Sequence, residues 1–172
     1  MLRARRIGGL EVVVAEPAHA RGWLKLVKDV AEEGRFLALE RVDLKPRRLA
    51  RHFAKRAWDV GECSIVAVRE DEVIGQLTAV RDSGIYRHAA EIGMSVGADH
   101  RRQGVGAALI GAASDWARWA GVEKLTLMVF PHNEVAIKFY EASGFVREGL
   151  RRRHAKMTYG YEDLAEMSLF LD

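Results

Sequence analysis

The sequence predicts an α+β fold of three layers, in which helices cover both faces of a central, mixed but mostly antiparallel sheet. The chain has 172 residues, 49% of them hydrophobic and 30% charged, which suits one soluble domain with its own core over residues 1–172. Its middle part, Ala89–Phe130, reads as strand, glycine-bearing loop, helix and strand. Such a βαβ unit makes its two strands parallel, whereas the segments on either side predict antiparallel hairpins.

The first third predicts one strand and two helices. Leu10–Ala15 is a β-branched run that is typical of a strand. Apolar residues then recur at helical spacing from Pro17 until Gly34. A basic amphipathic helix is expected over Pro46–Asp59, with Leu49, Phe53 and Ala57 on one side. Phe36–Leu39 is either a short strand or an extended link.

The period of the hydrophobic pattern then changes to two. Ser64–Arg69 and Val73–Val80 predict a hairpin, and Ala89–Val96 a third strand. A loop with glycines, Gly97–Gly104, precedes a long helix that ends near Ala120. Its apolar stripe is expected to be Val105, Leu109, Ala112, Trp116 and Trp119.

The last third predicts three strands and one helix. Lys124–Phe130 is nearly all apolar, as expected for a strand that is covered on both faces. A helix over Asn133–Ser143 would be capped by Asn133 and closed by Gly144. Phe145–Arg151 and Leu164–Leu171 are predicted to be antiparallel neighbours.

Composition excludes several classes of protein. Cys63 is the single cysteine, so neither an internal disulfide nor a cysteine-based zinc cage can form. No histidines stand at metal-ligand spacing, and we expect no metal. Apolar runs are far shorter than the roughly 20 residues that span a bilayer, and Met1–Arg6 is charged with no apolar run behind it. We therefore expect a cytoplasmic protein with no membrane partner.

Positive charge is unevenly spread. Lys and Arg exceed Asp and Glu by three over the chain, but Arg147–Lys156 alone carries a local charge of +4. This segment is either a solvated face or a contact for an acidic acceptor, a phosphorylated cofactor or nucleic acid. A non-enzymatic nucleic-acid-binding domain is one alternative function. We do not expect it, because only Tyr159 and Tyr161 could stack on bases and no known nucleic-acid module is present.

The loop before the long helix suggests anion binding. Arg101, Arg102 and Gln103 precede Gly104, Val105, Gly106 and Ala107. Free N–H groups at a helix N-terminus bind anions, and glycines let the backbone approach a ligand closely. The loop is thus either a pyrophosphate site or only a glycine-started helix with two solvated arginines. A Walker A loop is excluded, because no Gly-Lys-Ser/Thr sequence follows.

A second alternative is a serine hydrolase, since Gly93–Gly97 reads Gly-x-Ser-x-Gly around Ser95. The nucleophile elbow of that class requires its serine on a sharp turn between strand and helix. Here Ser95 is predicted within a strand, about nine residues before the helix. This disfavours the hydrolase.

Three motifs together resemble the GNAT superfamily of acetyl-CoA-dependent N-acetyltransferases. Arg101, Gly104 and Gly106 match its Arg/Gln-x-x-Gly-x-Gly/Ala signature, the strand Glu91–Val96 precedes it, and Asn133 and the segment Phe139–Phe145 follow in the right order. The resemblance is strong over residues 91–145 and looser over 149–167, where it is similar to ribosomal-protein and polyamine acetyltransferases. Ala98 and Gln103 depart from residues common in the family, but neither removes a backbone amide.

The resemblance implies acetyl-CoA as co-substrate and a mode of binding it. The backbone of Met94, Ser95 and Val96 would contact the pantetheine arm where two parallel strands splay apart. The amides of Gln103–Ala107, together with Arg101 or Arg102, would hold the pyrophosphate. On the following helix, the cofactor would lie against Asn133, Ala136 and Tyr140.

The resemblance also implies direct acetyl transfer to a primary amine. Glu91 stands where several members carry a general base, although an ordinary carboxylate pKa of about 4.3 makes a weak one; another carboxylate or water alone remains open. Tyr140 would be the acid, or else only a core tyrosine, and the Met94 N–H an oxyanion donor.

The acceptor itself stays open: a protein N-terminus, a lysine, a polyamine or a small amino compound. Its pocket is expected between the helices of Pro17–Asp59 and the hairpin Ala155–Glu162, with Tyr161 and Glu162 as contacts. A homodimer is compatible with the resemblance, but no interface is specified.

Overall fold

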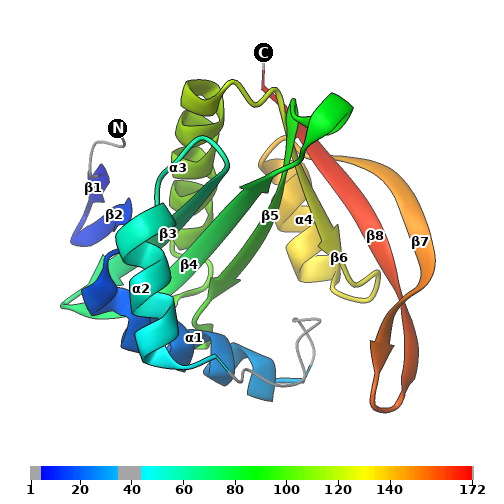
Figure 1. The fold of residues 1–172 in the computed structure, drawn as a ribbon. Coiled ribbons are helices and arrows are strands. Elements are labelled where there is room, and N and C mark those ends of the chain that lie inside the picture. Colours follow the sequence, from blue (N-terminus) through cyan, green and yellow to red (C-terminus); the bar gives the residue numbers. More distant parts are fainter. Residues whose placement is uncertain (1–4, 35–43, 172) are drawn as a thin grey trace.

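A single eight-stranded sheet organises the protein in the order β1-β2-β3-β4-β5-β6-β8-β7 (Figure 1). The computed structural model describes residues 5–34 and 44–171. Its strands are β1 (Arg5–Ile7), β2 (Leu10–Val14), β3 (Glu62–Arg69), β4 (Glu72–Arg81), β5 (Ala89–Val96), β6 (Lys124–Val129), β7 (Val146–Met157) and β8 (Gly160–Phe170). Every neighbouring pair is antiparallel except β5 and β6.

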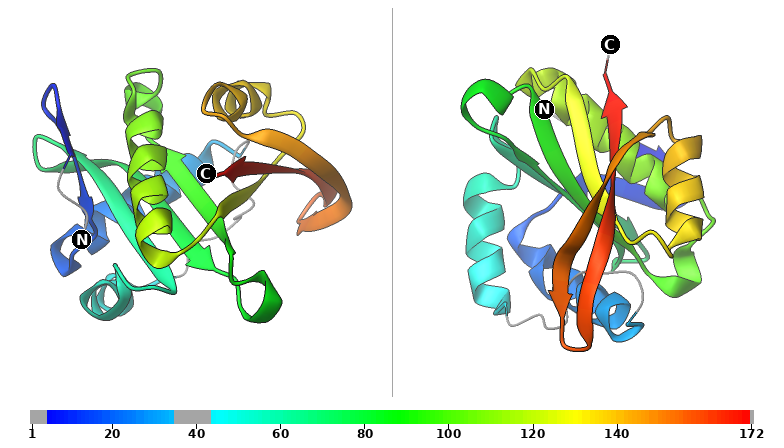
Figure 2. Two further views of the ribbon diagram at one scale, coloured as in Figure 1. Left: turned by 90° about the horizontal axis from the view of Figure 1, so that it is seen from above. Right: turned by 90° about the vertical axis from the view of Figure 1, so that its right-hand side faces the viewer.

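Helices lie on both faces of this sheet, which confirms the predicted three-layer α+β class (Figure 2). On one face lie α1 (Ala20–Glu32) and α2 (Pro46–Arg56), and on the other α3 (Val105–Ala120) and α4 (Glu134–Ala142). Two hydrophobic clusters match the two faces. One gathers Trp23, Leu49 and Phe53 against Val66, and the larger one surrounds α3.

The βαβ unit is present as predicted, but its parallel pairing is short. β5 and β6 are paired only over Ala89–Glu91 and Lys124–Thr126. Beyond these residues β5 continues along β4, and β6 continues along β8. The two strands therefore separate, and the sheet is forked at this point.

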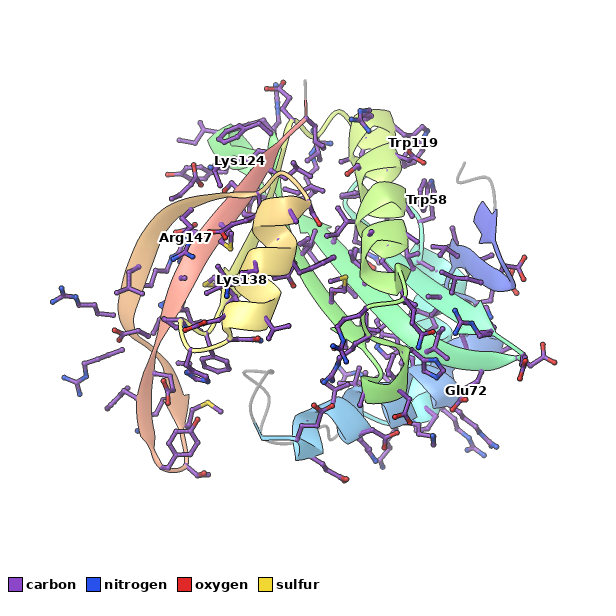
Figure 3. All side chains as sticks on the ribbon, turned by 180° about the vertical axis from the view of Figure 1, so that it is seen from behind. Trp58, Glu72, Trp119, Lys124, Lys138 and Arg147 are labelled. Atoms are coloured by element: carbon purple, nitrogen blue, oxygen red, sulfur yellow. The ribbon has the colours of Figure 1, made fainter. Side chains whose placement is uncertain are left out.

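Two core predictions are wrong. Trp119 is 49% exposed and rests against Trp58, with ring centroids 5.7 Å apart, at the solvent end of α3 (Figure 3). β6 is not buried on both faces: Leu125, Leu127 and Val129 are buried, but Thr126 and Met128 are only half-buried. The reason is that, among the described elements, the helices next to β6 lie on one of its faces (Figure 1).

Element boundaries shift where tertiary pairing extends them. β7 and β8 pair as far as Met157 and Gly160, so the predicted separate hairpin Ala155–Glu162 is the end of these two strands. The basic helix α2 ends at Arg56 rather than Asp59. Asn133 caps α4 as expected, its side chain accepting a hydrogen bond from the Ala136 N–H. Phe36–Leu39 lies outside the described residues.

Within residues 5–34 and 44–171, none of the helices combines the length and apolar character that a membrane crossing needs.

Candidate functional site

The fork between β5 and β6 exposes backbone polar groups. In the β4–β5 ladder the Gly97 N–H donates to the Ile74 carbonyl oxygen (3.0 Å). Because hydrogen-bonded pairs alternate along an antiparallel ladder, Gly93 and Ser95 bond to β4, whereas the N–H groups of Met94 and Val96 are directed away from it. They face the opening toward β6, where no strand partner follows.

A cavity of about 880 Å³ fills this fork. Its walls come from β5, β6, the loop before α3, and α4. The predicted site residues that line it are Glu91, Met94, Ser95, Val96, Arg101, Arg102, Gly104, Gly106, Ala107, Asn133, Ala136 and Tyr140. Residues far apart in the sequence thus meet around one space.

The N-terminus of α3 opens into the cavity. Gly104 precedes the helix with a φ of +81°, a left-handed conformation that glycine adopts without strain. The first bond of the helix runs from the Ala108 N–H to the Gly104 carbonyl oxygen (3.0 Å). The N–H groups of Val105–Ala107 therefore have no partner within the helix, and the positive end of its dipole lies with them. This end can bind an anion.

Gly106 lines the cavity and also has a packing role that the sequence did not suggest. A Cβ at Gly106 would lie 2.8 Å from the Cζ of Phe139. The missing side chain thus lets α3 and α4 approach each other closely. Phe139 was not predicted as part of the site, because only the packing of the two helices brings it there.

Arg101 is engaged within the protein. Its guanidinium donates to both carboxylate oxygens of Glu33 (2.8 and 2.6 Å) and to the Val96 carbonyl oxygen (3.0 Å). This ties the cavity loop to the end of α1. Arg102 also lines the cavity but is exposed, and among the described residues no hydrogen bond or ion pair ties its side chain to another part of the chain. Glu33 lies 68 positions before Arg101, so no local signal could have revealed the pair.

Tyr140 faces the cavity from α4. Its ring packs against Phe139 and Phe145, with centroids 5.3 and 5.5 Å apart. Burial raises the pKa of Tyr140 to about 12, because the ionised phenolate would lose its hydration. The hydroxyl therefore stays protonated at neutral pH.

Glu91 lies at the last paired position of the fork, opposite Thr126 of β6. Its side chain is exposed and lines the cavity. Nearby, Arg151 donates two hydrogen bonds to Glu166 (3.0 and 2.9 Å). Glu166, and less strongly Glu91, raise the pKa of Arg151. Glu91 thus lies close to a charged group, Arg151 with Glu166, at the edge of the fork.

Ser95 does not have the surroundings of a hydrolase nucleophile. It is buried on β5, one residue before the strand ends, and its hydroxyl accepts a hydrogen bond from Gln76 Nε2 (3.2 Å). Gln76 reaches it across the β4–β5 ladder, a contact that the sequence did not predict. Ser95 therefore lies on a straight strand beside an amide, which does not support the hydrolase alternative.

Four predicted residues do not line the cavity. Val105, the first residue of α3, is buried in the core. The side-chain oxygen of Gln103 accepts a hydrogen bond from Arg69 (2.7 Å). Tyr161 is exposed on β8, where Arg153 stacks over its ring at 4.3 Å. Glu162 follows it on the same strand. The last two thus lie toward the free end of the β7–β8 hairpin.

Within the described part of the chain, no three His, Cys, Asp or Glu side chains gather closely enough to hold a metal ion. The expectation of a metal-free site stays a prediction.

Comparison with known proteins agrees with this geometry. The profile of the acetyltransferase (GNAT) family matches residues 24–145, well over half of the chain. The chain belongs to the GNAT family. The match covers the fork, the loop before α3 and the whole of α4.

Individual curated relatives of this GNAT protein match only part of the chain, at moderate sequence identity. It is 31% identical over 106 residues to the L-amino acid N-acetyltransferase AaaT of Escherichia coli K12, covering 60% of this chain and 65% of that protein. It is 37% identical over 85 residues to the E. coli K12 ribosomal protein bS18-alanine N-acetyltransferase, covering 49% and 57%. The chain thus spans less than two thirds of the length of the curated relatives it matches.

Its fold is shared with solved structures. One is YncA from Salmonella typhimurium with its cofactor acetyl-CoA, at a TM-score of 0.82 and 20% identity over 96% of this chain and 95% of that one.

Proposed function

We propose that this GNAT protein is an N-acetyltransferase that moves the acetyl group of acetyl-CoA directly to a primary amine. The forked cavity carries the proposal: it joins free backbone amides of a splayed strand, a helix N-terminus and a protonated tyrosine in one space. Family membership and the names of both E. coli relatives support the same reaction class.

The residues present fit acetyl-CoA. The amides at the start of α3 and the exposed guanidinium of Arg102 suit its pyrophosphate. Arg101 would position this loop through Glu33 rather than bind the phosphates. The N–H groups of Met94 and Val96 suit the amides of the pantetheine arm. Asn133 uses its side-chain oxygen to cap α4, which leaves its amide nitrogen for the ligand.

Bound acetyl-CoA supplies an activated acetyl thioester. The Met94 N–H would stabilise negative charge that develops on the carbonyl oxygen. Glu91, directly or through water, would take a proton from the amine, which must be neutral to attack. Tyr140 would hold the proton that the departing sulfur needs. Together the oxyanion donor, the base and the acid would support direct transfer of the acetyl group from sulfur to nitrogen, without a covalent enzyme intermediate.

Thermal unfolding tests the proposal. A ligand at 100 times its Kd stabilises a protein by about 2.7 kcal/mol, which is roughly 5–11 °C in Tm for a chain of this size. We expect acetyl-CoA to raise the Tm by this amount, and NAD and ATP to leave it unchanged. Thiol release across a panel of amines then identifies acceptors. No shift at millimolar acetyl-CoA would refute the proposal.

The acceptor is left open by the relatives, since one is named for amino acids and the other for a ribosomal protein. We place its pocket on the front of the sheet, between α1, α2 and the β7–β8 hairpin. Tyr161 and Glu162 would contact the part of an acceptor that extends beyond the cavity.

A further inference from the structure

Two basic elements flank the part of the sheet where the cavity opens. In Figure 1, α2 stands on one side and the β7–β8 hairpin on the other, with strands β4, β5 and β6 between them. Residues 45–56 carry six of the 27 Lys and Arg and none of the 24 Asp and Glu. The rest of the chain therefore has a net charge of −3. Net positive charge is therefore concentrated on α2, whereas the β7–β8 hairpin carries five Lys and Arg against four Asp and Glu, with the cations gathered on β7.

The charge on α2 is not neutralised within the described structure. Arg47, Arg48, Arg51 and Lys55 are exposed on the side opposite to the buried Leu49 and Phe53. None of these four cations has an acidic partner among residues 5–34 and 44–171, whereas α1 and α4 carry the pairs Lys25–Asp29 and Lys138–Glu134. Like charges four residues apart disfavour a helix. The exposed positive charges of α2 therefore do not stabilise the helix itself.

Strand β7 of the hairpin adds a second group of cations, beside an aromatic ring of β8. Arg153 and Lys156 lie over the Tyr161 ring, at 4.3 and 5.9 Å from its centroid. Arg152 and His154 are exposed beside them. None of these residues, and none of the α2 cations, lines the cavity. A small amino compound inside the cavity would therefore touch neither surface.

From this arrangement we infer that the acceptor is an acidic polypeptide, whose reactive amine enters the fork while its acidic residues lie between α2 and the hairpin. The inference rests on the proposed acetyl transfer. Surfaces of one sign raise the local concentration of an oppositely charged ligand and repel polyamines and lysine-rich chains. Nucleic acid has the matching charge but no aliphatic primary amine to receive an acetyl group.

Three eight-residue peptides test the inference. Each has an amino-terminal alanine and one lysine, so that either kind of amine can react, and the other positions are acidic, neutral or basic. We expect kcat/KM to be highest for the acidic peptide and to fall as salt is raised. Arg48→Gln with Arg51→Gln should lower kcat/KM for the acidic peptide about tenfold at low salt, with little change for the neutral one.

A matched control removes two charges elsewhere. Arg118→Gln with Lys138→Gln alters exposed cations of α3 and α4, on the back of the molecule (Figure 3), and should change kcat/KM less than twofold. Equal use of the three peptides, or no transfer to the acidic one, would overturn the inference. So would an RNA oligonucleotide that binds through Arg48 and Arg51 while no peptide is preferred. Failure of the proposed function is distinguished by the absence of any Tm shift with acetyl-CoA.

Discussion

The two sides of the fork differ in how their strands are covered. β3 lies between helices on both faces, and Ile65, Val66 and Ala67 are consecutive residues with no exposed surface. β7 has α4 on one face only, and it is exposed along most of its length. The first side is therefore packed on both faces, whereas the second leaves charged side chains such as Arg151 and Glu166 partly exposed. The cavity lies at the boundary, where backbone groups of β5 lose their strand partner.

Truncating one large side chain on each side should give the largest contrast. Trp116 of α3 is fully buried between the helix and the sheet, and its Nε1 donates to the Asp59 carbonyl oxygen (2.7 Å). Trp116→Ala should lower the free energy of unfolding by about 3–5 kcal/mol. Leu150→Ala, on β7 where the side chain is 52% exposed, should cost under about 0.5 kcal/mol. Urea unfolding measures both, and equal losses would remove the distinction between the two sides.

At the boundary, Tyr140→Phe should affect turnover rather than binding. The ring contacts with Phe139 and Phe145 remain, but the proton is lost. We expect kcat to fall by about 100-fold or more, with little change in acetyl-CoA affinity. Tyr86→Phe makes the same chemical change at an exposed loop position and should be silent. Unchanged turnover in Tyr140→Phe would make Tyr140 a packing residue.

The same tyrosine should make the protein sensitive to alkaline pH. The pKa of Tyr140 is about 12 in the folded protein, above the ordinary value of about 10 in an unfolded chain. A raised folded-state pKa stabilises the protein below pH 10, and this stability is lost as pH rises from 10 to 12. The difference corresponds to about 2–3 kcal/mol. Tyr140→Phe has no phenol to ionise, so the unfolding free energy of wild type should fall relative to that of the variant as pH rises from 10 to 12. A difference between the two that stays constant over this range would contradict the burial of the hydroxyl.

Two strand glycines give the smallest contrast. A Cβ at Gly75 of β4 would lie 2.8 Å from Val105 Cγ1 and 3.1 Å from Leu109 Cδ1, whereas nothing lies within 4 Å of one at Gly149 of β7. Gly75→Ala should destabilise by about 1–2 kcal/mol through overpacking. Gly149→Ala should be neutral or stabilise by up to about 1 kcal/mol, because it restricts the unfolded chain. Thermal unfolding checks both, and a neutral Gly75→Ala would show that α3 can shift on the sheet.

Local pattern was sufficient for most elements and for one wall of the cavity. The change of period from helical spacing to alternation located the strands, and Asn133 and Gly144 bounded α4 through their capping preferences. The loop motif placed its glycines and amides at the start of α3. These signals come from residues a few positions apart, so they can be recognised without knowledge of the tertiary structure.

Contacts between distant segments could not be predicted in this way. The commitment of Arg101 to Glu33 depends on where α1 ends relative to the loop. The contact of Gly106 with Phe139 depends on how closely two helices pack, and the exposure of Trp119 on its position against Trp58 at the surface. An apolar or charged residue type does not specify which partner will reach it.

The sequence by itself determined the element order, the βαβ unit and the residue types available for binding an anion and moving protons, because backbone preference and hydrophobic period act locally. Only the tertiary structure decided which arginine is held by Glu33, which glycine packs against a second helix, and that α2 and the β7–β8 hairpin flank the same opening. Those outcomes follow from the strand order of the sheet, since pairing β6 with β8 and separating it from β5 creates the space that all of these residues surround.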